Sequence, residues 1–332
     1  MSMRAWRTSG EGGNIALRST PEPVLHPDGL LVRVEACGIC RTDLHLVDGE
    51  LPPRKPLTTP GHQVVGRVVA VGAETSGFDV GDRAGIAWLR GTCGSCRWCR
   101  SGRENLCPDA RFTGWDVDGG FAELAAVPAA YAYALPAETD SVTTAPLLCA
   151  GIIGFRALER AALPPGGRLA LFGFGSSAAI TARLARAAGA EVVVVTRGDG
   201  NRALARRMGL EVTDGETDLP RHPVDAAIVF APAGTLVPAA LEATTAGGTV
   251  VVAGIHLSPV PSLDYDRLLF RERDLRSVTA NTRADGDAFL RLAGHLDLAP
   301  DVTTYPFERL DEALDDLRSG RASGSLVLTV DR

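Results

Sequence analysis

The chain has 332 residues, of which 45% are hydrophobic and 22% are charged. This is ordinary globular composition, and the length predicts two domains that each bury their own core. The formal net charge is −6 and the basic residues form no long block, so no nucleic-acid partner is expected. The N-terminal residues lack the apolar core of a signal peptide, and no apolar run approaches the ~18 residues of a membrane span. We therefore expect a cytoplasmic protein without a membrane partner.

The first 150 residues carry short β-like runs, such as 30–34 and 64–71, punctuated by Gly, Pro and Asp. This pattern predicts a β-rich, barrel-like domain. From about residue 152, apolar strands alternate with helical patterns, which is typical of βαβ units on a doubly wound parallel sheet. The candidate strands of this sheet are 168–172, 191–196, 225–230 and 249–254.

The valines of 192–195 follow one another without alternation, as expected for a strand that helices cover on both faces. After residue 284, the pattern predicts a helix at 287–296, a second helix at 310–318 and an apolar strand at 326–330. These last elements suit either domain. We assign 1–151 and 284–332 to the β-rich domain, with a cysteine lobe at 91–108, and 152–283 to the parallel-sheet domain.

Seven cysteines in a reducing compartment are expected to be metal ligands or free thiols rather than disulfides. Four of them form the pattern C-x2-C-x2-C-x7-C within a glycine-rich stretch. Four thiolates so placed suit a closed tetrahedral Zn²⁺ site that leaves no position for substrate. An iron–sulfur cluster is the alternative, because repeated C-x2-C also binds such clusters. The four are Cys93, Cys96, Cys99 and Cys107.

The three remaining cysteines are Cys37, Cys40 and Cys149. A catalytic zinc needs three protein ligands and one open position, which Cys40, His62 and Cys149 would supply as a Cys2His set. Spacing alone leaves this assignment open.

A glycine-rich motif, G-F-G-S-S-A, follows the predicted strand 168–172 and precedes a helical pattern at 179–188. In this context, backbone amides and a helix N-terminus bind a pyrophosphate, and Ala is accepted at the third position. A plain tight turn is the alternative. The residues expected to bind the cofactor here are Gly173, Gly175, Ser176, Ser177 and Ala178.

The end of the second strand of the parallel sheet bears on the choice of cofactor. An NAD enzyme places Asp or Glu there to bind the ribose 2′-OH, whereas this chain has Thr196 and Arg197. A hydroxyl and a guanidinium, with Arg202 nearby, suit a 2′-phosphate, so NADP(H) is favoured over NAD(H). Three further residues lie past strand ends and are expected to line the nicotinamide side: Ala231, Gly254 and Ile255.

Three segments resemble those of the zinc-dependent medium-chain alcohol dehydrogenases: V-E-A-C-G-I-C-R-T-D-L-H at 34–45, G-H at 61–62 and A-P-L-L-C-A-G at 145–151. The cysteine lobe fits the same family. The resemblance covers essentially the whole chain and is closest to the bacterial cinnamyl-alcohol-dehydrogenase-like branch. It implies a GroES-like catalytic domain, a Rossmann domain, two zinc ions per chain and a homodimer or homotetramer. The reaction it implies is hydride transfer between a nicotinamide cofactor, here expected to be NADP(H), and a primary aromatic, allylic or aliphatic alcohol or aldehyde.

The resemblance also implies roles for single residues. Cys40, His62 and Cys149 match the catalytic zinc ligands, and Cys37 matches a position that does not bind zinc. Four further matches are Asp43, which holds the zinc-binding histidine; Thr42, which contacts the substrate oxygen; His45, which passes the proton to solvent; and Arg41, which contacts the cofactor pyrophosphate. A cap or turn role for Asp43 and a surface role for His45 and Arg41 are the alternatives.

One departure from the family is Gln63, where relatives have glutamate after the Gly-His pair. Our hypothesis is that zinc stays bound while ligand exchange or turnover changes, because an amide is a poorer partner for a dication. Two other functions remain open. One is a zinc-binding family member without catalysis, and the other is a reductase of C=C bonds or quinones. The complete Cys2His set argues against the reductase. Four aromatic residues are candidates for an apolar substrate pocket or for ordinary core positions: Trp88, Phe112, Trp115 and Phe270.

Overall fold

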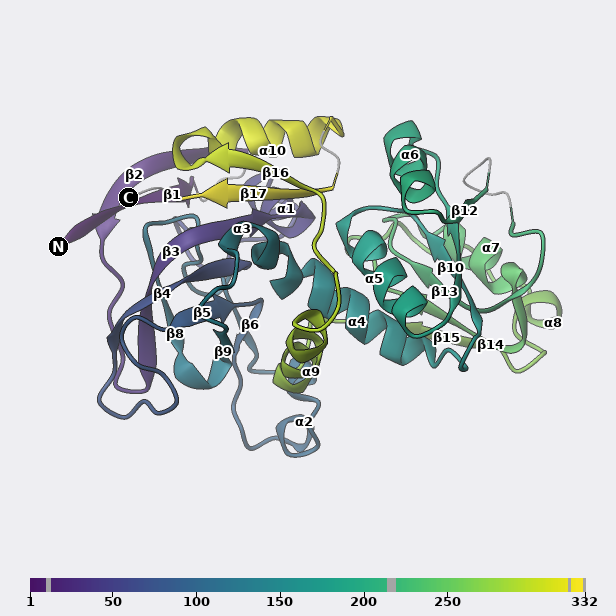
Figure 1. The fold of residues 1–332 in the computed structure, drawn as a ribbon, viewed down its shortest axis with the longest axis horizontal. Coiled ribbons are helices and arrows are strands. Elements are labelled where there is room, and N and C mark those ends of the chain that lie inside the picture. Colours follow the sequence, from purple (N-terminus) through teal and green to yellow (C-terminus); the bar gives the residue numbers. More distant parts are fainter. Residues whose placement is uncertain (10–12, 214–218, 322–323, 331–332) are drawn as a thin grey trace. The chain divides into compact units, whose positions relative to one another are not determined.

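The computed structural model describes residues 1–9, 13–213, 219–321 and 324–330 (Figure 1). They form two compact units. The first comprises Met1–Cys149, Ala280–Leu290 and Ala299–Arg332, and the second comprises Ala150–Thr279 and Arg291–Leu298. The boundaries expected from the sequence place residues 150–151 and 291–298 with the β-rich domain and 280–283 with the parallel-sheet domain, whereas these three segments group the other way.

The first unit is built on one seven-stranded sheet whose strand order is β16-β17-β3-β4-β5-β9, with β8 also paired to β3. Strand β3 (Gly29–Ile39) is central, because it pairs antiparallel with β4, β8 and β17. Its residues Leu30, Val32 and Val34 alternate into a core that also contains Leu310 and Leu314 of the C-terminal helix. The C-terminal segment therefore completes the core of this unit.

The elements of the first unit, where η denotes a 3-10 helix, are β1 (Ser2–Thr8), β2 (Ile15–Pro21), β3, α1 (Arg41–Val47), β4 (Val64–Val71), β5 (Arg83–Ile86), β6 (Leu89–Gly91), α2 (Arg97–Arg100), η1 (Glu104–Leu106), β7 (Arg111–Phe112), β8 (Leu124–Pro128), η2 (Ala129–Tyr131), β9 (Ala132–Leu135), α3 (Ser141–Thr144), η3 (Ala145–Leu148), β16 (Val302–Pro306), η4 (Phe307–Arg309), α10 (Leu310–Ser319) and β17 (Ser325–Thr329). Helix α9 (Arg283–Ala293) begins in this unit.

The second unit is a six-stranded sheet in the order β12-β11-β10-β13-β14-β15, and every pair in it is parallel (Figure 1). The chain runs outward from β10 in one direction and then from β13 in the other, so the strand order reverses between these two strands. Ligands of open α/β sheets bind at such a reversal. The elements are α4 (Ala150–Ala161), β10 (Arg168–Phe172), α5 (Ser176–Ala187), β11 (Glu191–Val195), α6 (Asp199–Arg207), β12 (Glu211–Val212), β13 (Val224–Val229), α7 (Leu236–Ala243), β14 (Thr244–Val252), α8 (Tyr265–Leu268) and β15 (Asp274–Ser277).

Both faces of this sheet are buried, as the run of valines predicts. Val192 and Val194 of β11 pack into a cluster that contains the alanines of α5, and Val193 and Val195 pack into a second cluster with Leu236 and Leu241 of α7. The fold class expected from the sequence, a β-rich GroES-like part and a doubly wound parallel sheet, is confirmed.

The predicted helix at 287–296 begins earlier in the structure, at Arg283. Thr282 accepts a hydrogen bond from the amide of Asp285 (3.1 Å), and the Asp285 carboxylate accepts one from the amide of Thr282 (2.7 Å). This reciprocal cap starts the helix one turn before its apolar pattern. Within the described residues, no single helix is long and apolar enough to cross a membrane, and one bent pair, Ser141–Leu148 with Ala150–Ala161, meets the criteria of length and composition only jointly.

Candidate functional site

Asp43 organises the start of α1. Its carboxylate is fully buried and accepts hydrogen bonds from the amide of Cys40 (2.9 Å) and the amide of Gly61 (3.0 Å). The same carboxylate lies 3.4 Å from Nδ1 of His62. Asp43 thus caps the helix, and its carboxylate also lies within ion-pair distance of the His62 ring, which is compatible with the predicted histidine-holding role.

The turn before His62 requires glycine. Gly61 has φ +95°, and a Cβ there would approach the Phe121 ring to 2.7 Å and the Cys37 sulfur to 2.9 Å. Only glycine adopts this backbone and leaves that space empty. The turn delivers His62, whose side chain is 2% exposed, to the start of β4.

Three of the predicted metal ligands converge within the first unit. Cys40 lies between β3 and α1, His62 precedes β4, and Cys149 follows η3. The ligand atoms of the three residues all lie within 4.8 Å of one another, and Cys40 Sγ is 3.5 Å from His62 Nε2. With Zn–S about 2.3 Å and Zn–N about 2.0 Å, two ligands of a tetrahedral zinc stand about 3.5 Å apart. The Cys2His set therefore fits one zinc ion, and among the described residues the group has three ligands rather than four.

The charge of this site also suits a dication. Burial opposes a charged ring at His62, but the Cys40 sulfur and the Asp43 carboxylate outweigh it and raise the pKa of His62 to about 10. The hydrogen bond from Cys149 and burial raise the pKa of Cys40. The buried Asp43 carboxylate beside two sulfur ligands favours a cation here, and a bound metal would deprotonate the thiols that hold it.

Helix α1 carries the other predicted groups. Thr42 and His45 stand one turn apart and are partly buried, whereas Arg41 is exposed. Cys37, which is expected not to bind metal, is fully buried in the apolar core of β3, and burial raises the pKa of its thiol. This environment suits a small hydrophobic residue.

Gln63 is buried, with 2% of its surface exposed. Its backbone carbonyl accepts a hydrogen bond from Gly38, but its side-chain nitrogen has no hydrogen-bond partner in the described chain. A buried amide donor without a partner is destabilising, so this position is not explained by stability.

A stack of aromatic side chains lies on one side of His62. Trp88 packs edge-on against His62 with ring centroids 4.9 Å apart, and it stacks on Phe112 and Trp115. These three predicted pocket residues form one apolar wall. Phe270, by contrast, belongs to the second unit, is 65% exposed and contacts Tyr265.

The cysteine lobe brings its four sulfurs to one point. The Sγ atoms of Cys93 and Cys107 are 3.5 Å apart, as are those of Cys96 and Cys99, and all four lie within 4.8 Å of one another. Ligands around one tetrahedral zinc with Zn–S about 2.3 Å stand about 3.8 Å apart. The set fits one closed metal ion, whereas a cluster of several irons would spread its thiolates further.

Backbone amides favour the thiolate at one cysteine of the lobe, whereas burial raises the pKa of Cys107 to about 11. Hydrogen bonds from the amides of Ser95 and Cys96 lower the pKa of Cys93 to about 6. The lobe is attached to the rest of the unit through Glu104, a buried carboxylate that accepts a hydrogen bond from the amide of Arg283 (3.0 Å).

The glycine motif lies at the reversal point of the parallel sheet. Gly173 has φ +86°, and a Cβ there would stand 2.8 Å from the backbone nitrogen of Ala231. Gly175 is the N-cap of α5, whose first turn contains Ser176, Ser177 and Ala178. A first helical turn directs its amides away from the helix, which makes such a turn suitable for a phosphate group.

The residues after β11 and β14 are also at this edge of the sheet. Thr196 is 4% exposed and Arg197 is exposed. Arg202 forms an ion pair with Asp199, with 2.6 Å between Nη2 and Oδ1. The Asp199 carboxylate therefore competes with a 2′-phosphate for the Arg202 guanidinium. Gly254 lies close to the carbonyls of Phe230 and Ala231, and Ile255 is 45% exposed.

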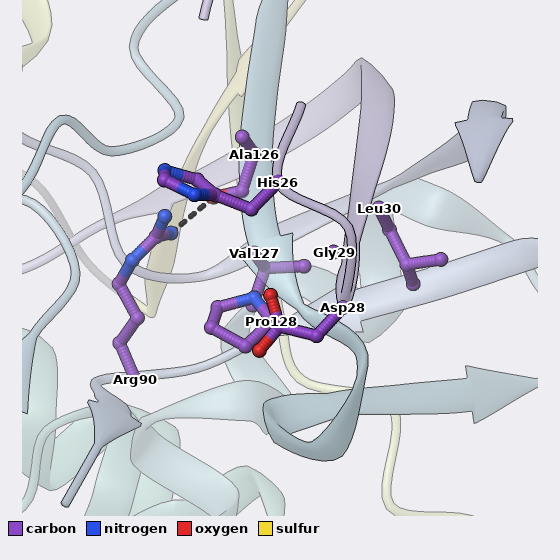
Figure 2. A pocket seen from close by; sticks show the side chains of 8 residues that line it. All are labelled: His26, Asp28, Gly29, Leu30, Arg90, Ala126, Val127 and Pro128. Atoms are coloured by element: carbon purple, nitrogen blue, oxygen red, sulfur yellow. Dashed lines mark hydrogen bonds between the residues drawn. The ribbon is translucent and has the colours of Figure 1, made fainter. Parts of the chain in front are cut away.

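Two hollows lie in the first unit. One has a volume of about 40 Å³, and in it the Arg90 guanidinium donates to the Ala126 carbonyl near His26 (Figure 2). This volume holds only a few water molecules. The other, of about 390 Å³, lies beside the cysteine lobe and is lined by Glu104, Tyr133 and Asp287.

Two residues were missed by the sequence reasoning. Asp199 pairs with Arg202, and Glu50 contacts Nδ1 of His45. The Asp48-Gly49 pair before Glu50 is a turn signal that would have indicated a return of the chain toward His45.

Known protein families match both the N-terminal part of the chain and the part that follows it. Residues 26–137 match the alcohol dehydrogenase GroES-like domain, and residues 178–294 match the zinc-binding dehydrogenase family. The Mycobacterium tuberculosis protein named "Probable alcohol dehydrogenase AdhA" is 51% identical over 99% of this chain and 98% of its own length.

Solved structures give the same result. A cinnamyl alcohol dehydrogenase from Sorghum bicolor has a TM-score of 0.90 and 25% identity over 99% of this chain and 98% of its own. A structure from Sinorhizobium meliloti that is described as a zinc-binding dehydrogenase was solved with bound NADP. It has a TM-score of 0.87 and 29% identity over 99% of both chains.

The fold and the two cysteine-rich clusters define a zinc-binding dehydrogenase. The chain belongs to the zinc-dependent medium-chain alcohol dehydrogenase family, in agreement with the resemblance of its motifs.

Proposed function

We propose that this protein is an aldehyde reductase and alcohol dehydrogenase that transfers a hydride between NADP(H) and a primary aromatic, allylic or aliphatic alcohol or aldehyde. The observation that carries the proposal is the convergence of Cys40, His62 and Cys149, with His62 held by Asp43. We further propose two zinc ions per chain, a cytoplasmic location and a homodimer or homotetramer.

The residues of the first unit have distinct tasks in this reaction. Zinc, when bound, supplies Lewis acidity toward the substrate oxygen, and the nicotinamide cofactor exchanges the hydride. Cys40, His62 and Cys149 hold the metal, and Asp43 fixes the His62 ring. Thr42 exchanges a proton with the substrate oxygen, and His45 carries that proton to solvent. Trp88, Phe112 and Trp115 provide an apolar wall that excludes water and suits an aromatic substrate.

The residues of the second unit are proposed to hold the cofactor. Gly173, Gly175 and the first turn of α5 bind the pyrophosphate, with a further contact from Arg41. Thr196 and Arg197 bind the 2′-phosphate, and Arg202 contributes once it leaves Asp199. The relative from Sinorhizobium meliloti that was solved with NADP supports this preference. Ala231, Gly254 and Ile255 line the nicotinamide side.

The alternative functions are less well supported. A reductase of C=C bonds or quinones has no need of the Cys2His set, which is complete here. A zinc-binding member without catalysis would be favoured by Gln63, whose side-chain nitrogen is buried without a partner.

Turnover tests the proposal directly. Protein of measured zinc content is given benzaldehyde or cinnamaldehyde with NADPH or NADH at neutral pH. We expect rapid oxidation of NADPH and a kcat/KM for NADPH at least tenfold above that for NADH. A tenfold ratio corresponds to about 1.4 kcal/mol of differential binding. A charge-assisted hydrogen bond to the 2′-phosphate supplies this free energy. No turnover with either cofactor, despite two bound zinc ions, would favour the non-catalytic alternative.

Arg197→Ala is the matched test of the cofactor preference. It should raise KM for NADPH about tenfold and leave KM for NADH unchanged, because only NADPH carries the 2′-phosphate. Arg221→Ala, which removes another exposed arginine of the same unit, serves as the control. Equal effects of both variants on the two cofactors would contradict the assignment.

Gln63→Glu tests the effect of having glutamine where the family has glutamate. A carboxylate at this buried position gives the metal a negatively charged neighbour, so we expect the catalytic zinc to exchange faster with a coloured chelator and turnover to change by several-fold. Gln63→Met, which removes the buried donor and adds no charge, is the control. Exchange and turnover rates in Gln63→Glu equal to those of the unchanged protein would count against the hypothesis.

A further inference from the structure

The chain reverses direction directly after α1. Gly49 has φ +79°, and its amide lies 3.3 Å from the carbonyl of Leu46. The amide of Leu51 then donates to the carbonyl of His45 at 2.9 Å. Because glycine adopts this backbone without steric penalty, the Asp48-Gly49 pair makes a tight turn. The turn returns Glu50 to the side of His45.

His45 and Glu50 differ in their access to water. The Glu50 carboxylate contacts Nδ1 of His45. The side chain of His45 is 14% exposed and that of Glu50 is 59% exposed. A carboxylate at one ring nitrogen fixes the tautomer and orientation of the imidazole. Glu50 therefore links a largely enclosed imidazole to bulk water.

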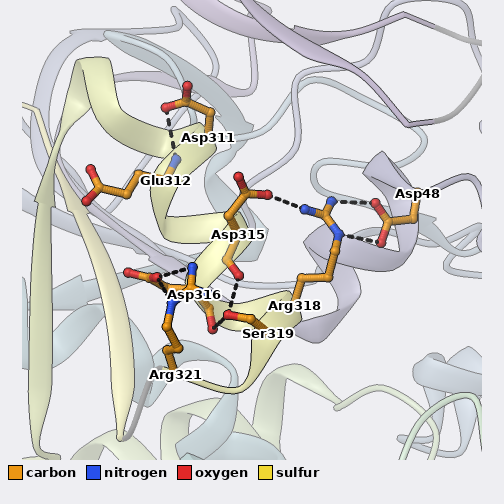
Figure 3. Close-up of polar contacts among 8 residues, drawn as sticks. All are labelled: Asp48, Asp311, Glu312, Asp315, Asp316, Arg318, Ser319 and Arg321. Carbon is orange, nitrogen blue, oxygen red and sulfur yellow. Dashed lines mark hydrogen bonds and ion pairs between the residues drawn. The ribbon is translucent and has the colours of Figure 1, made fainter.

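A second contact holds the same turn. Arg318 of α10 binds Asp48 with 2.6 Å between Nη2 and Oδ1 and 3.4 Å between Nε and Oδ2, and it also contacts Asp315 (Figure 3). A forked arginine–carboxylate pair restricts the geometry of both partners. Asp48 is thus neutralised by Arg318, and Glu50 is the carboxylate of this turn that contacts His45.

We propose that Glu50 is a positioning residue for His45 and the outer acceptor of its proton. This inference rests on the proposed function, in which Thr42 and His45 carry the proton. Oxidation of one alcohol yields one aldehyde, one hydride transferred to the nicotinamide and one proton. His45 takes that proton on one ring nitrogen and gives the proton on Nδ1 to the Glu50 carboxylate, which releases it to water. Aldehyde reduction uses the same steps in reverse.

The kinetic test compares Glu50→Gln with Glu74→Gln, which removes the charge of an exposed glutamate elsewhere in the first unit. Alcohol oxidation by the zinc-loaded protein is measured at neutral pH and constant ionic strength over a range of HEPES concentrations. We expect Glu50→Gln to lower kcat about tenfold with little change in KM, which is less than the roughly 10²–10⁴-fold effect of a direct acid or base because Glu50 acts through His45. Its kcat should rise with HEPES, because the buffer replaces the lost acceptor, whereas the unchanged protein and Glu74→Gln should not respond.

A spectroscopic test does not depend on turnover. In protein labelled with ¹⁵N-histidine, we expect the Nδ1 signal that disappears in His45→Gln to shift in Glu50→Gln and to stay in place in Glu74→Gln. An unshifted signal, an unchanged kcat at low buffer, or a lower kcat that HEPES does not restore would each overturn the proposal. If the unchanged protein oxidises no alcohol, the proposed function fails, and the His45 signal still reports whether Glu50 positions the ring.

Discussion

Cys40→Ser is expected to remove one of the two zinc ions that we propose and to lower kcat/KM for aldehyde reduction by on the order of 10³ or more, since the proposed reaction depends on Lewis acidity at the substrate oxygen. Cys40 is 3.5 Å from His62 Nε2, so a serine there leaves the histidine with an incomplete ligand set. The zinc content is measured by atomic emission, and folding by circular dichroism. The overall fold should persist, because the cysteine lobe retains its own ligands.

Cys37→Ala is the matched control, because Cys37 lies three residues away in the same segment and is fully buried in the apolar core. It should retain two zinc ions and activity, with a small loss of stability from a shorter side chain. Asp43→Asn should fall between the two, with a loss of about 10–100-fold, because the Asp43 carboxylate lies against the His62 ring and is proposed to orient it without binding the metal. If Cys37→Ala lost zinc and Cys40→Ser kept it, the assignment of the ligands would be wrong.

The strands of the fold could be predicted from the sequence where apolar runs are long and sharply bounded. The ranges 64–71 and 168–172 coincide with β4 and β10, because polar residues, glycine or proline interrupt the pattern at both ends. Helix boundaries were less predictable. The start of α9 depends on the reciprocal cap between Thr282 and Asp285, and the apolar pattern begins only after that cap.

The candidate site was predictable to different degrees in its two halves. The spacing of the lobe cysteines places all four in one loop, so their convergence is local. Cys40, His62 and Cys149 are far apart in the sequence, and they meet only because β3 pairs with β4 and η3 packs against both strands. The resemblance to the zinc-dependent alcohol dehydrogenases was what predicted these three residues as ligands of one metal. The pairs His45–Glu50 and Asp199–Arg202 and the buried, unpartnered nitrogen of Gln63 depend on side-chain geometry, which no pattern encodes.

Cys107→Ser is expected to remove the other zinc ion and to destabilise the first unit. Loss of a closed thiolate site removes binding free energy that also holds the loop together, and a loss of about 3 kcal/mol lowers the unfolding midpoint by about 6–12 °C in a domain of this size. Cys107 is buried, and its sulfur lies 3.5 Å from that of Cys93, so the variant leaves three thiolates without a complete tetrahedron. Thermal unfolding and zinc content together measure the effect.

The same experiment separates a structural role from a catalytic one. Below its unfolding temperature, Cys107→Ser should retain the zinc at Cys40, His62 and Cys149, so its remaining zinc content should be one ion per chain and its kcat should stay within a few-fold of the unchanged protein. Hydrogen exchange should accelerate first in residues 91–108 and then around Arg283, because Glu104 of the lobe accepts the Arg283 amide. Iron and acid-labile sulfide in the purified protein would instead support the iron–sulfur alternative. An unchanged unfolding midpoint in Cys107→Ser would show that the metal of the lobe does not stabilise the first unit.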